Sequence, residues 1–434
     1  MKKIFQYIIL AVVTIVMASC TSDIEETTAT TGKSNVQLVV GEFPAFGDSQ
    51  TRAIGTLDPG KTSWAEGDEL LLVIDNTFYG KQYATFTYND KSWKLTSGEL
   101  VYREGDPAYI PHVYYAPNYK WEAGKLVLKE GKAAGTDEYI EGKANITPNG
   151  QGINVSFADA TRKYSRLRIA TMPNMPITVD IDIYTPAGSS DMKWDQNYAL
   201  TSDEKGNAYL YGTFVPYSKF TVKYEEAPLA TYKFSQESKN AKSYALDATV
   251  VSLTDKAITY DQIVEDVKKE LYAGKTYINL ILAPDVDEET LEAIHIGLLE
   301  GDARDGTINL TLIGWKKIPS RGFMYWKMLK SIALPDVTEI AENAFSDCSG
   351  LQKVVLGNLT KVYGNVGKKG IFDGCRTKDI DLVLPKNQEL MKSEFYENSN
   401  QYIWKPTGES YFAGPNKDDG IFLGYQFMSV KKWE

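Results

Sequence analysis

The sequence predicts a multidomain, mostly β protein, with two β-sandwiches followed by an α/β solenoid of short repeats. Three observations predict this class. Between residues 36 and 250, short apolar, β-branched and aromatic runs alternate with turn signals, without helical stretches between them. After Leu253, apolar residues at helical spacing alternate with strand-like runs. From residue 329 onward, a pattern of strand, proline, phenylalanine and cysteine recurs in order, as stacked repeats do.

Length and composition limit the classes of function. The 434 residues suffice for two or three domains. Charged residues are 24% and hydrophobic residues 43%, so a hydrophobic core is available. The net charge of −10, without a long basic run, argues against a nucleic-acid partner. No catalytic motif occurs, and neither His112 nor His295 has metal-ligand spacing around it. We therefore expect a protein that is not an enzyme, with no catalytic residues, metal or cofactor.

The first 19 residues read as a secretory signal peptide. A lysine pair precedes the apolar run Ile4–Val16 and small residues; the run is too short to span a bilayer comfortably. The segment ends Ala18-Ser19-Cys20, which resembles a bacterial lipobox. That resemblance implies a lipidated Cys20 that anchors the chain to the outer membrane. The alternative is an ordinary cleavage site with an incidental cysteine.

Residues 20–35 are predicted to be a flexible tether, because they are polar and rich in threonine. The acidic stretch Asp23–Glu26 resembles the export signals of surface lipoproteins in Bacteroidetes. Together with the lipobox, it predicts an outer membrane lipoprotein at the cell surface or in a fimbrium.

Residues 36–160 and 161–250 are predicted to form the two β-sandwiches, with the break near 158–163. The turns between strands carry Asn-Asp, Asn-Gly and Pro-Ala-Gly, which favour tight reversals. The expected strands are Val36–Val40, Glu69–Asp75, Tyr83–Tyr88, Val113–Tyr115, Lys125–Leu128, Gly152–Phe157, Arg166–Ala170, Val179–Tyr184, Ala208–Phe214, Phe220–Tyr224 and Ala230–Phe234.

A resemblance to a known family rests on two elements of this part of the chain. Thr51-Arg52-Ala53 is followed by Thr62-Ser-Trp64-Ala-Glu-Gly67-Asp68 and an apolar strand. This opening is similar to that of the fimbrillin family of Bacteroidetes (Mfa-like and FimA-like proteins). The stretch Phe157–Ile169 resembles the start of that family's second sandwich. The alternative is a generic exported β-sandwich protein.

The fimbrillin resemblance implies a route of assembly. In that family a protease cuts after an arginine and removes the first strand; a strand from another subunit then fills the groove. Here the cut would fall between Arg52 and Ala53 and remove Val36–Val40, and the partners would be other fimbrial subunits. The alternative is an uncut arginine in a solvated loop. Family stalk subunits donate their C-terminal segment, but here a further domain follows, which favours a tip or accessory subunit.

Residues 251–434 are predicted to form the repeat domain with its caps. Thr259 and Gln262 form a capping box before a helix that ends near Gly274. A strand at Tyr277–Leu282, a helix at Asp287–Leu299 and a strand at Thr307–Ile313 follow, and we expect this α/β stretch to be the N-terminal cap. The aromatic residues of 396–434 predict a β-rich closing cap.

The repeat itself is an L-x-x-I-x-L strand followed by a return segment. Its copies begin at Leu329, Leu351 and Ile380. A period of 20–29 residues of this kind indicates a leucine-rich-repeat solenoid. The variant with Leu-Pro after the strand and Ala-Phe-x-x-Cys in the return segment resembles the BspA-like leucine-rich repeats of Bacteroidetes surface proteins. The alternative is an unrelated β-rich region with chance leucine spacing.

Two features of the repeats bear on function. Cys348 and Cys375 occupy equivalent positions in adjacent units, which favours a ladder of buried thiols, although an exported chain could pair them as a disulfide. The strand positions between the buried rows should point outward and form a candidate binding face. These positions are Ser331, Ala333, Lys353, Val355, Asp381 and Val383.

The favoured function is a surface-anchored fimbrillin-like subunit, tip or accessory, whose repeat domain mediates cell adhesion or protein interaction. Its expected partners are other fimbrial subunits, host proteins or glycans, and the outer membrane through the lipid anchor. The alternative is a surface glycan-binding lipoprotein of a nutrient-uptake system, with Trp315, Trp326 and Trp404 as candidate platforms if they are exposed.

Overall fold

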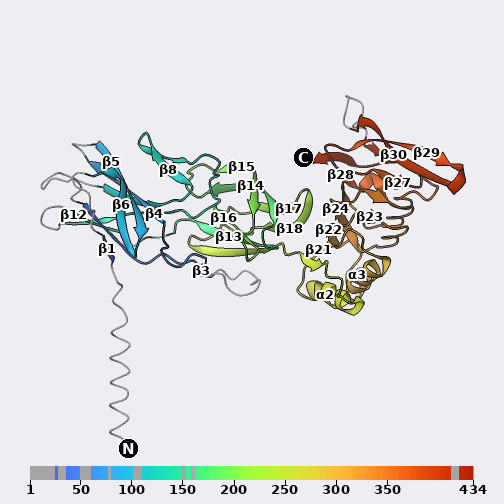
Figure 1. The fold of residues 1–434 in the computed structure, drawn as a ribbon, viewed down its shortest axis with the longest axis horizontal. Coiled ribbons are helices and arrows are strands. Elements are labelled where there is room, and N and C mark those ends of the chain that lie inside the picture. The colour runs from blue at the N-terminus through green and yellow to red at the C-terminus, as the bar shows by residue number, and fades with distance from the viewer. Residues whose placement is uncertain are drawn as a thin grey trace, which may run out of the picture.

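The computed structural model is mostly β, with two α-helices among the residues it describes. These residues form three regions that follow one another along the long axis of the molecule (Figure 1). The predicted lipidation site Cys20 and the predicted processing site, Arg52 and Ala53, lie outside the described residues. The described residues are 25–27, 36–48, 60–76, 80–100, 110–148, 153–157, 160, 162–411 and 420–433.

The first β region packs two sheets around one core. The core holds Leu38, Leu72, Phe86, Val113 and Phe157, all buried. The strands of the first sheet are β1 (Glu25–Thr27), β2 (Val36–Val40), β12 (Ile153–Phe157) and β11 (Asn145–Pro148), in that order. The strands of the second sheet are β10 (Ile140–Lys143), β7 (Ile110–Tyr115), β4 (Glu69–Asn76), β5 (Gly80–Asn89) and β6 (Ser92–Glu99).

The Trp64 element lies at one end of this core. The Trp64 indole donates a hydrogen bond to the Gly41 carbonyl at 2.8 Å. Its ring makes edge-to-face contacts with Phe43 and Trp93, at centroid distances of 4.8 and 5.1 Å. Such aromatic contacts add to the free energy of simple burial, so this element anchors the chain between β2 and β4. Outside the two sheets, β8 (Tyr119–Glu122) and β9 (Lys125–Leu128) form a separate hairpin.

The middle β region is built on an eight-stranded sheet with its own core, in which Leu167, Ile181, Leu210, Phe214 and Phe220 are buried. One of its edge strands comes from the N-terminal segment, so residues 36–48 contribute to both β regions. The strands are β18 (Ala227–Lys233), β17 (Lys219–Tyr224), β14 (Pro176–Pro186), β16 (Asn207–Thr213), β13 (Ser165–Ala170), β19 (Lys242–Asp247) and β3 (Gly47–Asp48), with β15 (Lys193–Thr201) paired to β14.

Residues 251–433, called the repeat region below, contain a seven-stranded parallel sheet, called here the long sheet. The repeat strands are neighbours in it, and the upstream strand predicted at Thr307–Ile313 joins them. The strands in order are β20 (Val251–Leu253), β21 (Tyr277–Leu282), β22 (Ile308–Ile313), β24 (Leu329–Leu334), β26 (Lys353–Leu356), β28 (Asp381–Pro385) and β33 (Ser429–Trp433).

Two helices connect the first strands of the long sheet, and both begin as predicted. The Thr259 side chain accepts a hydrogen bond from the Gln262 amide at the start of α2 (Tyr260–Tyr272). The Asp287 carboxylate accepts one from the Thr290 amide at 2.9 Å at the start of α3 (Glu288–Glu300). Each cap satisfies an amide that has no partner inside its helix.

The return segments of the repeats form a second, five-stranded sheet, called here the short sheet. Its first three strands are parallel and its last two form an antiparallel hairpin at the far end of the molecule (Figure 1). The strands in order are β23 (Lys317–Ile318), β25 (Glu339–Ile340), β27 (Lys361–Tyr363), β30 (Gln401–Ser410) and β29 (Glu389–Tyr396). The remaining elements are the 3-10 helices η1 (Thr377–Asp379) and η2 (Glu397–Ser399) and the strands β31 (Ile421–Phe422) and β32 (Tyr425–Gln426).

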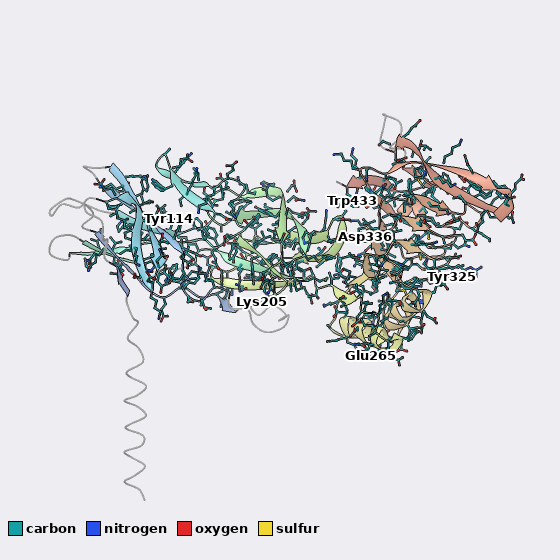
Figure 2. All side chains as sticks on the ribbon, in the orientation of Figure 1. Tyr114, Lys205, Glu265, Tyr325, Asp336 and Trp433 are labelled. Carbon is teal, nitrogen blue, oxygen red and sulfur yellow. The ribbon has the colours of Figure 1, made fainter. Side chains whose placement is uncertain are left out.

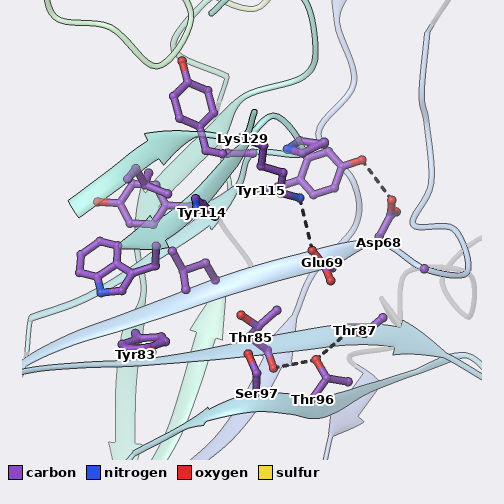
Figure 3. A pocket seen from close by; sticks show the side chains of 18 of the residues that line it. Asp68, Glu69, Tyr83, Thr85, Thr87, Thr96, Ser97, Tyr114, Tyr115 and Lys129 are labelled. Atoms are coloured by element: carbon purple, nitrogen blue, oxygen red, sulfur yellow. Dashed lines mark hydrogen bonds and ion pairs between the residues drawn. The ribbon is translucent and has the colours of Figure 1, made fainter. Parts of the chain in front are cut away.

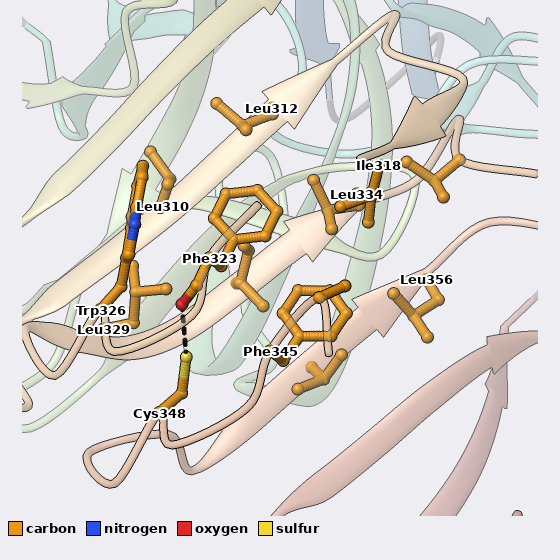
Figure 4. Packing of buried hydrophobic residues seen from close by; sticks show 14 of the residues in the cluster. Leu310, Leu312, Ile318, Phe323, Trp326, Leu329, Leu334, Phe345, Cys348 and Leu356 are labelled. Atoms are coloured by element: carbon orange, nitrogen blue, oxygen red, sulfur yellow. Dashed lines mark hydrogen bonds between the residues drawn. The ribbon is translucent and has the colours of Figure 1, made fainter. Parts of the chain in front are cut away.

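Stacked phenylalanines fill the space between the long and short sheets (Figure 4). The rings of Phe323 and Phe345 are nearly parallel with centroids 5.4 Å apart, and Phe345 and Phe372 follow at 5.1 Å. The rings of Tyr425 and Phe427 meet Phe372 edge-on and end the stack. The stacked rings pack the successive units together, because no single unit could bury its apolar row alone.

Cys348 and Cys375, the cysteines of the repeats, are free thiols. The Cys348 thiol donates to the Phe323 carbonyl at 3.0 Å, and the Cys375 thiol to the Phe345 carbonyl at 2.9 Å. Each thiol therefore bonds to the unit before its own. The two thiols form the predicted ladder, but only Cys348 is buried, whereas Cys375 is partly exposed; no disulfide joins them.

Candidate interaction surfaces

The six residues of the predicted binding face do lie side by side on the long sheet. One row runs through Ser331, Lys353 and Asp381, and a second through Ala333, Val355 and Val383. The inward row between them, with Ile332, Val354 and Leu382, belongs to the core. The strand period of two places the rows as the sequence predicted.

The expectation that this face is exposed is wrong. Val355 is only 1% exposed, and Ser331, Ala333 and Val383 are also buried. The three apolar residues form a small cluster with Ala227 at the start of β18, and Trp433 packs against it. The middle β region therefore covers the face, because β18 contacts β21, β22 and β24 and its first residue, Ala227, packs on the outer row (Figure 1).

Hydrogen bonds and packing join the two regions at this interface. The Asn279 amide donates to the Leu229 carbonyl at 2.9 Å, and the Thr311 hydroxyl donates to the Pro228 carbonyl. Ile313 and Ile281, from the repeat region, pack into the core of the middle region. The long sheet thus has a protein core on both of its sides.

A signal for this burial was present in the sequence and was missed. The repeat strands contain Ile332-Ala-Leu334, Val354-Val-Leu356 and Leu382-Val-Leu384, which are continuous apolar runs. Parallel strands that are covered on both faces have this composition, whereas a strand with one solvated face alternates. The outward alanine and valines were therefore a sign of a second covered face.

Lys353 is the charged residue at the centre of the interface. Burial is the largest cause that lowers its pKa, and the neighbouring ammonium of Lys223 lowers it further. Asp381, beside it in the row, accepts a hydrogen bond from Ser429 and pairs with Lys431 at 3.7 Å. The interface thus holds a half-buried lysine in surroundings that disfavour its charge.

The short sheet has an outer row of a different kind. Lys317, Glu339 and Lys361 pair side by side and carry alternating charge. The Lys317 ammonium lies 3.6 Å from the Glu339 carboxylate, and the Lys361 ammonium lies over the ring of Tyr363 at 4.6 Å. Their inward neighbours Ile318, Ile340 and Val362 are buried in the core. This row is solvated, as its charges require.

The β29–β30 hairpin extends this open side and carries exposed aromatic residues. Phe395 is 48% exposed and contacts the Tyr402 ring at 4.9 Å. The Lys368 ammonium donates to the Tyr402 hydroxyl at 3.1 Å, and Lys369 pairs with Glu342 at the same distance. A cavity of about 350 Å³ adjoins these side chains. Phe395, Tyr402, Lys368 and Lys369 are called the hairpin patch below.

The three candidate tryptophan platforms are not exposed. Trp315 and Trp326 are buried, and Trp404 packs against the core of the repeat region while its indole donates to the Gly364 carbonyl at 3.0 Å. His295 stacks on Trp326 with centroids 4.4 Å apart. Burial lowers the pKa of His295. These residues hold the repeat region together and offer no ligand platform.

Comparison with known protein families identifies the repeats. Residues 316–409 match the family model described as BspA type Leucine rich repeat region (6 copies). These residues form a BspA-type leucine-rich repeat region. The match covers the short sheet and the repeat strands of the long sheet from β24 to β28. No curated protein matches the chain.

Two further observations concern the described part of the chain only. Within it, no three histidine, cysteine, aspartate or glutamate residues come close enough to hold a metal ion. None of its helices has the length and apolar character needed to cross a membrane.

Proposed function

We propose that this chain is a surface-anchored, fimbrillin-like subunit, tip or accessory, whose BspA-type repeats form a small solenoid that mediates adhesion or protein interaction. The hairpin patch is the proposed contact surface. One observation supports this choice above all. The outer face of the long sheet is covered by the middle region, whereas Phe395 of the β29–β30 hairpin and the neighbouring Lys368 and Lys369 remain open to solvent. Repeats of this kind serve as binding surfaces in many proteins.

The composition of the hairpin patch suits a protein partner. Aromatic residues are enriched where protein interfaces concentrate their binding energy. Lys368 adds positive charge to the patch, whereas Lys369 is paired with Glu342, so an acidic group on the partner would be complementary to Lys368. The cavity of about 350 Å³ beside Phe395 gives room for one partner side chain.

The test is attachment of beads that carry the purified full chain to epithelial cells and to outer-membrane vesicles. Phe395→Ala with Tyr402→Ala should lower attachment by about tenfold or more, because loss of two central aromatic contacts costs ~2 kcal/mol or more. Tyr325→Ala is the matched control, since Tyr325 is 58% exposed elsewhere on the repeat region (Figure 2). Equal attachment of all three proteins, or no attachment by the wild type to either surface, would contradict the proposal.

Assembly with other fimbrial subunits is proposed to proceed by strand addition after a cut between Arg52 and Ala53. Supporting geometry comes from β2, which pairs in parallel with β12 and buries Leu38 and Val40. Loss of β2 would leave the β12 edge unpaired beside an apolar groove, which favours a donor strand. Treatment with an arginine-specific protease should yield Ala53 as the new N-terminus and increase binding of a donor-strand peptide. A cut chain that binds the peptide no better than the intact chain would exclude this route.

Membrane attachment is proposed to depend on acylation of Cys20, as the lipobox resemblance implies. Cys20→Ser should abolish incorporation of labelled palmitate and release the protein from the outer-membrane fraction. Incorporation at the wild-type level in that variant would contradict the lipoprotein assignment. The glycan-binding alternative loses its original basis, because Trp315 and Trp326 are buried and Trp404 packs against the core.

A further inference from the structure

A pocket lies on the first β region, far from the repeats. It has a volume of about 760 Å³, within the range of small-molecule sites. One side is the outer face of the sheet that contains β4, β5, β6 and β7, and the other is the β8–β9 hairpin (Figure 3). It is an open groove on the face of a sheet, and the core of this region lies on the opposite face.

The floor of the groove is a row of side chains across four strands. The strand register places Tyr114, Leu71, Thr85 and Ser97 next to one another. A register shift in β6 brings in Thr96 as an additional outward residue. Its hydroxyl lies 2.8 Å from that of Thr87 and 3.2 Å from the Thr85 carbonyl. The floor therefore offers several hydroxyls, each of which can both donate and accept hydrogen bonds.

Aromatic rings line one side of the groove. Tyr83 is 43% exposed, and its ring lies 6.2 Å from that of Trp121 on the β8–β9 hairpin. Figure 3 shows Tyr83 and Tyr114 on the same side of the pocket, facing the hydroxyl row. The faces of such rings attract polarised C–H groups.

Carboxylates line the other end, and most of their charge is already balanced. Asp68 pairs with Lys61 and accepts a hydrogen bond from the Tyr115 hydroxyl at 3.1 Å. Glu69 lies 3.8 Å from the Lys129 ammonium. Asp137 also lines the groove, and burial raises its pKa. These carboxylates can accept hydrogen bonds from a ligand, and this end of the groove has no net positive charge.

We propose that this groove binds a neutral oligosaccharide. Sugar rings present C–H faces that stack on aromatic rings, and their hydroxyls match a floor of hydroxyls beside carboxylates. No net positive charge favours an anionic ligand, because the ammonium groups of Lys61 and Lys129 are already paired with the carboxylates of Asp68 and Glu69. A lipid would leave the polar floor without partners. An extended peptide would need a free strand edge, whereas this groove lies on the face of four paired strands.

The site is independent of the function proposed for the repeats, because none of its residues belongs to the repeat region. Attachment through the hairpin patch and sugar binding in the groove can therefore succeed or fail separately. Variants in one site serve as controls for the other.

The test is titration calorimetry of the purified full chain with defined neutral hexasaccharides: maltohexaose, cellohexaose, xylohexaose and mannohexaose. A heparin hexasaccharide is the anionic comparison. At least one neutral sugar should bind, and Trp121→Ala and Tyr83→Ala should each weaken that binding by about tenfold, the scale of one lost stacking contact. Trp194→Ala is the matched control, because Trp194 is 66% exposed but does not line the groove.

Several outcomes would overturn the proposal. These are no binding of any neutral hexasaccharide at millimolar concentration, binding of heparin alone, or equal loss of binding in Trp194→Ala. Thr85→Val is a second test of the groove, and it changes no aromatic residue. It keeps the side-chain shape but removes a floor hydroxyl, so it should weaken sugar binding while the circular dichroism spectrum stays unchanged. Unchanged sugar binding in Thr85→Val together with both aromatic variants would also reject the site.

Discussion

The repeat region contains two sheets that share one repeat, yet their outer faces have opposite environments. On the long sheet, the outer row of Ala333, Val355 and Val383 is buried against the middle β region. On the short sheet, the outer row of Lys317 and Glu339 is open to solvent and paired by charge. Both inner rows face the same stack of phenylalanine rings. The repeat pattern therefore determines which side chains point into the core. Whether the opposite side of each strand is buried depends on which part of the molecule packs against it.

The comparison also locates function. A stacked repeat is usually expected to bind through its longer strand face, but here that face is an interface inside the molecule. The charged and aromatic side, with the β29–β30 hairpin, is the side left for partners. The middle region and the repeat region share hydrogen bonds and apolar contacts, so they should behave as one unit.

The largest expected effect comes from placing a charge on the covered outer face of the long sheet. Val355→Asp should cost on the order of 3–5 kcal/mol, because an uncompensated carboxylate would be buried against Ala227. Chemical denaturation would show a lower midpoint, or small-angle scattering would show that the two regions separate. Gln352→Asp is the control just before the same strand; Gln352 is exposed, and the variant is expected within ~0.5 kcal/mol of wild type. If both variants have the denaturation midpoint of the wild type, the outer face of the long sheet is not an interface in solution.

An intermediate effect is expected from the hydrogen bonds across the interface. Asn279→Ala should lower the free energy of unfolding by roughly 1–3 kcal/mol, because the carbonyls of Leu229 and Thr249 would lose a buried donor. Asn358→Ala removes an exposed amide from the repeat region and should change it by less than ~0.5 kcal/mol. Urea denaturation of both variants measures the difference. Equal losses of unfolding free energy in the two variants would mean that the middle and repeat regions hardly interact.

The smallest expected effect is on the pH dependence of stability, for which we compare two lysines, one on each sheet. Burial lowers the pKa of Lys353, whereas a hydrogen bond to Tyr363 raises the pKa of Lys361. With Lys353 the folded chain binds fewer protons than the unfolded chain, so its contribution to stability increases as pH rises toward the ordinary lysine pKa of ~10.4. With Lys361 the contribution is present below that pKa and is lost as pH rises through the raised value.

Substitution by methionine separates the two lysines. Lys353→Met should raise the free energy of unfolding by about 0.5 kcal/mol near neutral pH, because a disfavoured charge is removed while the stem still packs. Lys361→Met should not raise it. Denaturation midpoints at about pH 8 and pH 10 provide the measurement. A gain from Lys361→Met as large as that from Lys353→Met would show that the two faces do not differ electrostatically.

Strands with a buried apolar row were predicted well, and several strands that bury a single residue were missed. Val36–Val40 and Ile308–Ile313 contain several buried apolar residues, and the structure places strands there. By contrast, β6 buries only Trp93 and β15 buries only Tyr198. Such polar strands are held by pairing to a neighbour, so their own composition contains little strand signal.

The proposed sugar groove was not predicted for a related reason. Tyr83, Thr85, Tyr114 and Trp121 lie on strands or hairpins separated by many residues, and only the register of the sheet brings them together. No local motif marks them. The prediction came closer to the hairpin patch. The aromatic residues of 396–434 indicated a closing cap, but the sequence did not identify the contact residues.

The sequence by itself determined the local structure of this protein. The Thr259 and Asp287 caps, the inward rows of the repeat strands and the thiol ladder all depend on residues close along the chain or on a fixed period. Only the tertiary structure decided which face of the repeats is open. That choice depends on β18, about a hundred residues before the strands it covers, and contacts at such separation follow no period in the sequence. An outward side chain is therefore buried or exposed according to what docks on it, which strand geometry alone cannot specify.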